Sequence, residues 1–160
     1  SLNIKSELIN LHSLIEKSLK NNKLQINNKN GVINLKLSAN NTLIEGDKIH
    51  LINVFSNLID NALKYSVNTP IIHISTEDVI NGIVIKIKDN GIGIAKDFHV
   101  KVFDKLFRIP TGDRHDVKGF GLGLSYVKSI IEKHNGTIKV ESQIGKGSTF
   151  IVQLEAAKEY

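Results

Sequence analysis

Apolar residues recur at helical spacing along several stretches of the chain, and turn-forming residues separate these stretches. The spacing predicts helices over residues 4–20, over 47–65, within 96–107, and from the glycine-rich run at 119–124 to Asn135-Gly136. Asn3 and Asp47 are the expected caps of the first two helices, because a short polar side chain can accept from the first free N–H groups of a helix.

Short apolar runs between the helices predict strands. They cover residues 24–27, 32–37, 43–44, 71–77, 83–89, 137–142 and 148–154. Asn81-Gly82 is the clearest hairpin turn, because both residues tolerate the positive φ that tight hairpins require. We therefore expect the α/β fold class: a two-layer α/β sandwich in which about three helices cover one face of a mixed, mostly antiparallel sheet.

The long helix over 47–65 has an unusual polar side. It carries Asn53, Asn57, Asp60, Asn61 and Lys64, whereas the opposite side is apolar. An amide oxygen can ligate a hard cation, and an ammonium group can meet a phosphate. This side is therefore either an ordinary solvated face or the floor of a nucleotide-phosphate site, and the helix alone favours the solvated face.

Three glycine-rich turns follow that helix. At Asp89–Gly93 a carboxylate ends a buried strand, where it could accept from an exocyclic amine, although such a turn needs no ligand. At Gly119–Gly123 three alternating glycines precede a helix, whose free N–H groups could bind an anion. The turn at Gly145–Gly147 fits a plain hairpin as well as it fits a ligand contact. None of the three is decisive by itself.

The length and composition are typical of a single globular domain. The chain has 160 residues, 41% of them hydrophobic, which is enough for one core. It has no Cys, so disulfides and thiolate metal sites are excluded. The net charge of +5 comes from scattered lysines without a basic, aromatic-rich cluster, which argues against a nucleic-acid partner. Because the chain begins with Ser and contains no Met, we expect a fragment of a longer protein.

The order and spacing of five stretches resembles the catalytic, ATP-binding domain of bacterial sensor histidine kinases, the kinases of two-component systems. The stretches match that family's N, G1, F, G2 and G3 boxes in order: Asn-Leu-Ile-Asp-Asn-Ala-Leu-Lys-Tyr (57–65), Asp-Asn-Gly-Ile-Gly-Ile (89–94), Phe-Asp-Lys-Leu-Phe-Arg (103–108), Gly-Phe-Gly-Leu-Gly-Leu (119–124) and Gly-Lys-Gly-Ser-Thr-Phe (145–150). The resemblance implies a Bergerat fold over residues 1–155. We expect the tail at 156–160 to be frayed.

The resemblance implies that ATP and Mg²⁺ are the cofactors. Asn61 would ligate Mg²⁺ through its side-chain oxygen, and Asn57 would support the metal and phosphate geometry. Lys64 would reach the phosphates. Arg108 would contact the γ-phosphate, with Lys105 as a second candidate.

At the base end, the same resemblance implies that Asp89 accepts from the adenine amine. Tyr65 would flank the adenine, Gly91 and Gly93 would lie close to the ring, and Thr149 could assist through water.

A lid over residues 108–120 is also implied. Gly119 would free the lid, Phe103 and Phe107 would anchor it by packing, and the N–H groups that meet phosphates would come from Gly121, Leu122, Gly123 and Leu124.

The resemblance implies transfer of the γ-phosphoryl group to a histidine. Gyrase-type ATPases of the same fold carry a Glu where this chain has Asn57, and an amide cannot take a proton from water. A nucleotide-binding pseudokinase and a same-fold ATPase are the alternatives. None of the six histidines has the acid and Pro context of a phosphoacceptor: His12, His50, His73, His99, His115 and His134.

The expected partners follow from that missing acceptor. They are an upstream dimerisation and phosphoacceptor domain, without which the fragment is inactive, and indirectly a response regulator. The parent would be a homodimer anchored in the inner membrane, with this domain in the cytoplasm and monomeric when isolated. No apolar run here reaches transmembrane length.

Overall fold

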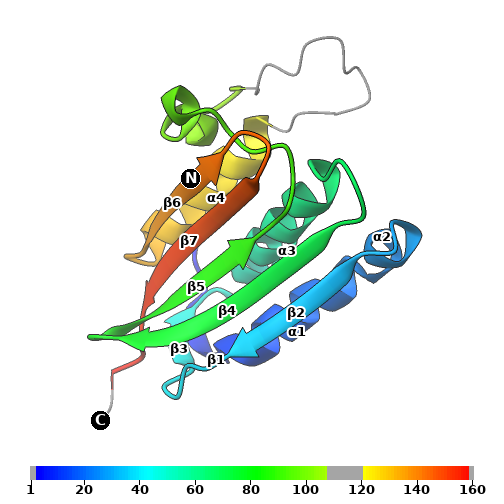
Figure 1. Cartoon of the computed structure of the whole chain (residues 1–160). Helices are drawn as coiled ribbons and strands as arrows, with labels where there is room; N and C mark the ends of the chain where they lie inside the picture. The colour runs from blue at the N-terminus through cyan, green and yellow to red at the C-terminus, as the bar shows by residue number, and fades with distance from the viewer. Residues whose placement is uncertain (1–2, 108–120, 159–160) are drawn as a thin grey trace.

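The computed structural model describes residues 3–107 and 121–158. Its centre is a five-stranded sheet in the order β2 (Val32–Leu37), β4 (Ile71–Val79), β5 (Gly82–Lys88), β7 (Gly147–Glu155), β6 (Thr137–Gln143). The strands β2 and β4 are parallel, and every other neighbouring pair is antiparallel (Figure 1). The mixed, mostly antiparallel sheet is therefore confirmed.

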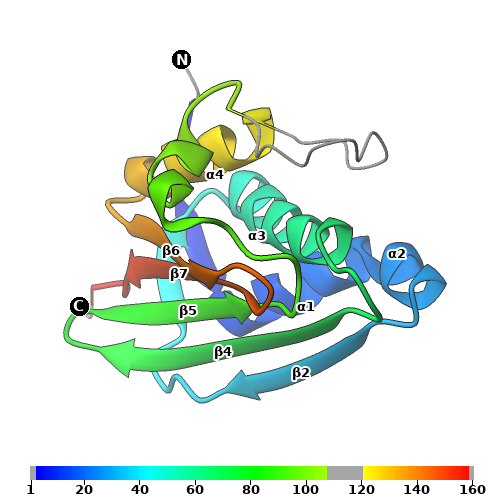
Figure 2. The same ribbon diagram turned by 45° about the horizontal axis from the view of Figure 1, so that its top comes forward.

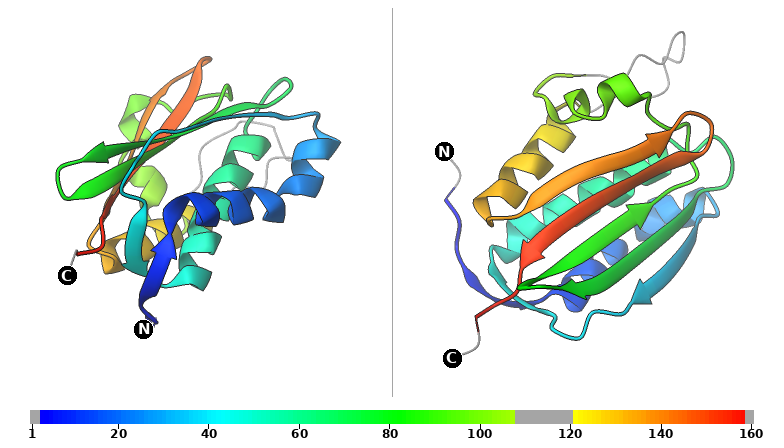
Figure 3. Two further views of the ribbon diagram at one scale, coloured as in Figure 1. Left: turned by 90° about the horizontal axis from the view of Figure 1, so that it is seen from below. Right: turned by 60° about the vertical axis from the view of Figure 1, so that its left-hand side comes forward.

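Three longer helices lie on one face of this sheet: α1 (Leu11–Asn21), α3 (Lys48–Lys64) and α4 (Gly121–Lys133) (Figures 1 and 2). Among the residues that the structure describes, none on the other face forms a helix (Figure 3). Strand β5 explains the arrangement, because Ile83, Ile85 and Ile87 are buried under the helices whereas Lys86 and Lys88 are exposed. The two-layer α/β sandwich is confirmed.

Helix α3 runs through the middle of the helical layer. Asp47 is its N-cap, as predicted, and its side chain accepts from the His50 N–H at 3.1 Å. Val54, Phe55 and Leu58 are at most 1% exposed, so the apolar side of the helix forms the centre of the core. Fixing α3 in this way also fixes the direction of its polar side.

The N-terminal prediction is partly wrong. Glu7–Asn10 form strand β1, which pairs antiparallel with β3 (Leu43–Gly46), and α1 begins only at Leu11. Asn10 is the cap, since its side chain accepts from the Ser13 N–H at 3.2 Å. The distant strand β3 overrides the local helical spacing, because its backbone groups satisfy those of β1.

The strand predicted at 24–27 is also wrong, because Lys23–Asn28 form the short helix α2. No described strand pairs with this segment, and Leu24 is 73% exposed. An apolar pair two positions apart cannot distinguish a strand from a helical turn.

Two other predicted segments differ from the structure. The helix expected within 96–107 is a pair of 3₁₀ turns, η1 (Lys96–Phe98) and η2 (Lys101–Phe103). The tail is not frayed as far as 157, because the N–H groups of Ala156 and Ala157 donate to the carbonyls of Asn81 and Leu43. Within the described residues, no helix has the length and apolar character to cross a membrane.

Candidate functional site

Segments that the sequence analysis singled out meet at one end of the sheet (Figures 1 and 2). They are the last turns of α3, the turn at 89–93 after β5, the β6–β7 hairpin and the first turn of α4. The Ile92 N–H donates to the Tyr65 carbonyl at the end of α3 (3.0 Å), and the Gly145 N–H in the hairpin donates to the Ile92 carbonyl (2.8 Å). The turn at 89–93 is therefore held between a helix and a hairpin.

Asp89 is the buried acid of this site, with 7% of its surface exposed. Its Oδ1 accepts from the N–H groups of Gly91 (2.8 Å) and Ser148 (3.1 Å). Burial raises the pKa of this carboxyl, although the two hydrogen bonds act in the opposite direction. Among the described residues both bonds end on Oδ1, so Oδ2 is the oxygen that can meet a donor from a ligand.

The two glycines of the turn allow close backbone packing. A Cβ on Gly91 would lie 2.6 Å from the Tyr65 carbonyl oxygen. Gly93 has φ +77°, and its Cβ would lie 2.1 Å from the Gln143 carbonyl oxygen. The close approach that the glycines predict is therefore made first of all to α3 and to the β6–β7 hairpin.

The structure corrects the expectation for Thr149. Thr149 lies opposite Lys88 and Glu141 in the sheet, and both of those side chains are exposed on the face without helices. Because side chains alternate along a strand, Thr149 belongs to that open face. Its neighbour Ser148 is 6% exposed and contacts Asp89 instead. Ser148, which the sequence analysis missed, is therefore the residue of β7 at this site.

Asn57 and Asn61 lie one turn apart on the polar side of α3. Asn57 is half-buried and Asn61 is only 8% exposed. Neither amide side chain has a hydrogen-bond partner within the described part of the chain. No fully buried side-chain nitrogen or oxygen there lacks a partner, so the Asn61 amide must reach accessible space. A nearly buried amide that is open to a ligand suits a cation site.

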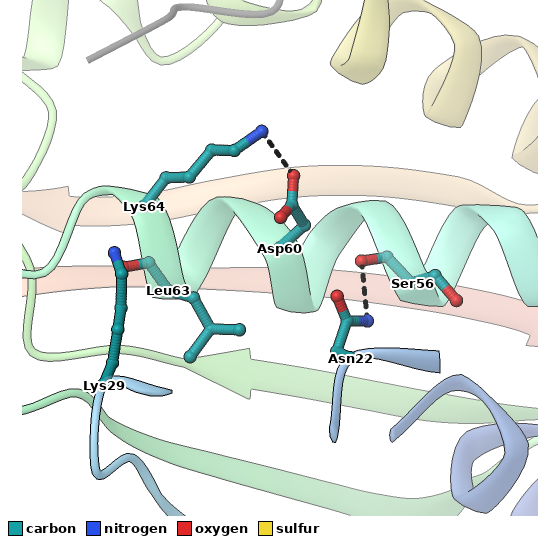
Figure 4. A network of polar contacts seen from close by, with 6 residues as sticks. All are labelled: Asn22, Lys29, Ser56, Asp60, Leu63 and Lys64. Carbon is teal, nitrogen blue, oxygen red and sulfur yellow. Dashed lines mark hydrogen bonds and ion pairs between the residues drawn. The ribbon is translucent and has the colours of Figure 1, made fainter. Parts of the chain in front are cut away.

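Two lysines lie on opposite sides of the end of α3: Lys64 belongs to this helix, and Lys29 follows α2 (Figure 4). The ammonium of Lys64 pairs with Asp60 at 2.6 Å, on the side away from Lys29 and Asn22. The ammonium of Lys29 instead donates to the Leu63 carbonyl at 2.7 Å and so satisfies the helix end. Asn22 supports the same helix, because its amide donates to the Ser56 carbonyl at 3.2 Å.

The segment that ends at residue 107 packs against the core. The ring of Phe103 meets Phe150 edge-on at 6.1 Å between ring centroids, and Phe107 lies 5.6 Å from Phe98. Both aromatic residues therefore make packing contacts, whereas Lys105 is exposed. Arg108, Gly119 and the rest of the lid predicted at 108–120 lie outside the described residues.

Helix α4 begins at Gly121 and includes Leu122, Gly123 and Leu124. Leu124 is 7% exposed in the core, so only its backbone could serve a ligand. Further along α4, Val127, Ile130 and Ile131 are 0% exposed, so this side of the helix packs into the core.

Comparison with known proteins identifies the class. A family model described as histidine kinase-, DNA gyrase B- and HSP90-like ATPase matches residues 46–158. The chain belongs to this family. Within it the chain is 42% identical over 157 residues to the sensor protein RprX of Bacteroides fragilis (strain YCH46). The match covers 97% of this chain and 30% of RprX, so the chain spans less than a third of that relative.

Solved structures show the same fold. The histidine kinase AdeS of Acinetobacter baumannii is 29% identical with a TM-score of 0.77, over 98% of this chain and 70% of the AdeS chain. The catalytic domain of the histidine kinase ThkA is 24% identical with a TM-score of 0.82, over 97% and 99%. ThkA in complex with the response regulator TrrA is 23% identical with a TM-score of 0.80, over 96% and 42%. The resemblance to sensor histidine kinases is thus confirmed.

Proposed function

We propose that this domain binds ATP with Mg²⁺ and transfers the γ-phosphoryl group to a histidine on a separate domain. The observation that carries the proposal is the meeting of two elements at one end of the sheet. One is the buried acid Asp89, whose Oδ2 can accept from a ligand, and the other is the open amide side of α3 at Asn57 and Asn61. The base of a nucleotide needs a hydrogen-bond acceptor such as Asp89, and its phosphate chain needs a cation that the amides could hold.

The amides of α3 fit Mg²⁺. Among residues 3–107 and 121–158, no cluster of three or more His, Asp or Glu side chains could hold a metal. A metal ion here would therefore rest on few protein ligands and on phosphates, which is the usual preference of Mg²⁺. Asn61 would be the ligand, Asn57 would support it one turn earlier, and Lys64 would meet the phosphates. Bound Mg²⁺ would supply neutralisation of phosphate charge.

The turn at 89–93 fits an adenine. The Asp89 Oδ2 would accept from the exocyclic amine, while Gly91 and Ser148 hold the other oxygen. Tyr65 would flank the ring, and Gly93 would approach it through the backbone. A buried carboxylate costs more free energy than a solvent-exposed one. The burial of Asp89 therefore supports a role in recognition of a ligand.

The start of α4 and the residues around 105–108 would complete the binding site for the phosphates. We assign the contacts to the N–H groups of Gly121, Leu122, Gly123 and Leu124, at the start of α4, where free N–H groups attract anions. Arg108 would neutralise the γ-phosphate, and Lys105 is the second candidate.

Asn57 favours a histidine over water as acceptor. An amide cannot take the proton of an attacking water, whereas an imidazole is itself a nucleophile and needs no strong base. The acceptor would lie on the kinase's dimerising helical domain, in a homodimeric parent anchored in the inner membrane. The ThkA complex with a response regulator supports a response regulator as the final partner.

The first test is nucleotide binding. Mg²⁺ with ADP at millimolar concentration should raise the melting temperature of the chain, because a ligand that binds only the native state stabilises it. Asn61→Ala should remove the Mg²⁺-dependent part of the shift. Asn34→Ala, which changes an exposed amide on β2, is the matched control and should keep the whole shift. The absence of any shift in the unsubstituted chain would refute the proposal.

The second test is phosphotransfer. The domain joined to its upstream helices should form phosphohistidine from ATP, and Asn57→Asp should reduce the rate without changing the acceptor. A phosphorylated product that is stable in acid would contradict transfer to histidine.

A further inference from the structure

Ser142 carries an unusual number of hydrogen bonds for one hydroxyl. It occupies the last inward-facing position of β6, two residues after the buried Val140. Its Oγ lies 2.7 Å from the Ile94 nitrogen, 2.9 Å from the Gly147 carbonyl oxygen and 2.7 Å from the Ser148 Oγ. A polar residue at an inward strand position is costly unless such partners satisfy it.

The proton count settles the direction of these bonds. A hydroxyl donates one hydrogen bond and can accept two. The Ile94 N–H can only donate and the Gly147 carbonyl can only accept, so Ser142 accepts from Ile94 and donates to Gly147. The remaining lone pair accepts from the Ser148 hydroxyl. All three bonds are then satisfied together, and the hydroxyl of Ser142 is saturated.

These bonds connect the two halves of the base site. Ile94 directly follows the turn at 89–93, whereas Gly147 and Ser148 begin β7. The Ser148 N–H donates to the Asp89 Oδ1, and a Cβ on Gly147 would lie 2.1 Å from the Asp89 carbonyl oxygen. The position of the Asp89 carboxylate therefore depends on the distance between the turn at 89–93 and the β6–β7 hairpin. The Ser142 hydroxyl links the two through its hydrogen bonds.

We propose that Ser142 is a positioning residue for base recognition, which holds the turn at 89–93 against the β6–β7 hairpin and thereby aims the Asp89 Oδ2 at the exocyclic amine of the base. The inference rests on the proposed nucleotide function. Ser142 does not touch the nucleotide itself and acts through Ser148, Gly147 and Ile94. Its loss should weaken discrimination between bases more than it weakens contacts to phosphate.

The experiment compares two nucleotides by calorimetry. IDP carries a carbonyl where ADP carries the exocyclic amine, and its N1 carries a hydrogen, so the ratio of their Kd values reports on recognition of this edge of the base, which Asp89 would meet. The unsubstituted chain should prefer ADP by about tenfold or more, as expected for a paired buried polar group. Ser142→Ala should reduce that preference by about fivefold, which corresponds to one neutral hydrogen bond. Ser142→Thr retains the hydroxyl and should restore the preference.

A buried serine elsewhere serves as the matched control. Ser18 is 0% exposed and its hydroxyl donates to the Leu14 carbonyl in α1, away from the site. Ser18→Ala should lower the melting temperature but leave the ADP to IDP ratio unchanged. If Ser142→Ala does not fold, Ser148→Ala removes one of the three bonds and should reduce the ratio in the same direction.

The possible failures are distinguishable. If the unsubstituted chain binds neither nucleotide, the proposed function and this inference are both overturned. If it binds and discriminates, but Ser142→Ala discriminates equally well, only the positioning role is overturned. If Ser142→Thr behaves like Ser142→Ala, the hydroxyl is not the group that matters, and the inference is wrong.

Discussion

Gly93→Ala is the sharpest test of how the turn at 89–93 is held. Gly93 has φ +77°, and a Cβ there would lie 2.1 Å from the Gln143 carbonyl oxygen and 2.9 Å from the Ile144 Cα. Gly145, in the facing hairpin, has φ +82° but nothing within 4 Å of its Cβ direction. The two alanine variants therefore share the backbone strain, and only Gly93→Ala adds a collision with backbone atoms.

The magnitudes can be separated. A non-glycine residue in the left-handed region costs about 1–2 kcal/mol, and this is the whole expected loss for Gly145→Ala. In Gly93→Ala the hairpin must also move away, which breaks the 2.8 Å bond from the Gly145 N–H to the Ile92 carbonyl. One lost bond adds about 1 kcal/mol, and the disturbed packing adds on the order of 1–2 kcal/mol. The total for Gly93→Ala is about 3–5 kcal/mol.

Urea denaturation of both variants measures the difference, and ADP titration follows its effect on the site. The melting temperature should fall by about 2–4 °C for each kcal/mol in a domain of this size. Gly93→Ala should also lose most ADP affinity, because the Asp89 side of the site moves, whereas Gly145→Ala should keep it. Equal losses of stability in the two variants would refute the reasoning, because the close approach to Gln143 would then cost nothing.

Three further predictions concern polar groups. Burial raises the pKa of Asp89 in the folded chain above the ordinary value of 3.8. As pH rises from 3.8 through the raised pKa, the unfolded chain ionises more readily than the folded chain, so the free energy of unfolding falls. Asp89→Asn should remove that fall and be at least as stable as the unsubstituted chain at pH 7, while losing its preference for ADP. Lys64→Met should weaken ADP binding about tenfold but change stability by less than about 1 kcal/mol, because the pair with Asp60 is partly solvated. Tyr126→Phe should cost about 1–2 kcal/mol, since it removes a hydroxyl 2.6 Å from the His50 Nδ1.

Each of these predictions has its own check. Urea titrations at pH 4 and pH 7 test Asp89→Asn, and a variant that stays less stable than the parent at pH 7 would contradict the cost of burial. Lys29→Met is the control for Lys64→Met, because Lys29 bonds the Leu63 carbonyl at the same helix end and should affect stability rather than binding. For Tyr126→Phe, an unchanged denaturation midpoint would mean that the bond to His50 contributes nothing.

Local patterns were sufficient where a segment makes its own structure. The spacing of apolar residues predicts α3 and its Asp47 cap, and the alternating isoleucines with Asn81-Gly82 predict the β4–β5 hairpin. In these segments the hydrogen bonds are internal or lie between neighbours in sequence. The periodicity of the side chains therefore contains most of the information needed.

Non-local pairing explains the errors. The start of α1 was wrong because β1 pairs with β3, more than thirty residues away. For α2, no strand of the described part of the chain pairs with the segment, and it forms a helix against the local pattern. The sequence analysis named Thr149 and missed Ser148, because a motif shows which residues lie close in sequence, whereas the sheet register shows which of them faces Asp89.

The sequence by itself determined the class of this protein, the amide side of α3 and the acid at the end of β5. Those features rest on short-range order, since a helix or strand displays its residues with a fixed period. Only the tertiary structure decided how the acid is held. The contacts from Ser142 to Ile94 and from Ser148 to Asp89 join segments 48 and 59 residues apart, and no periodicity along the chain encodes such a distance. They exist because β7 lies beside β5, with β6 on its other side, so that the hairpin meets the turn.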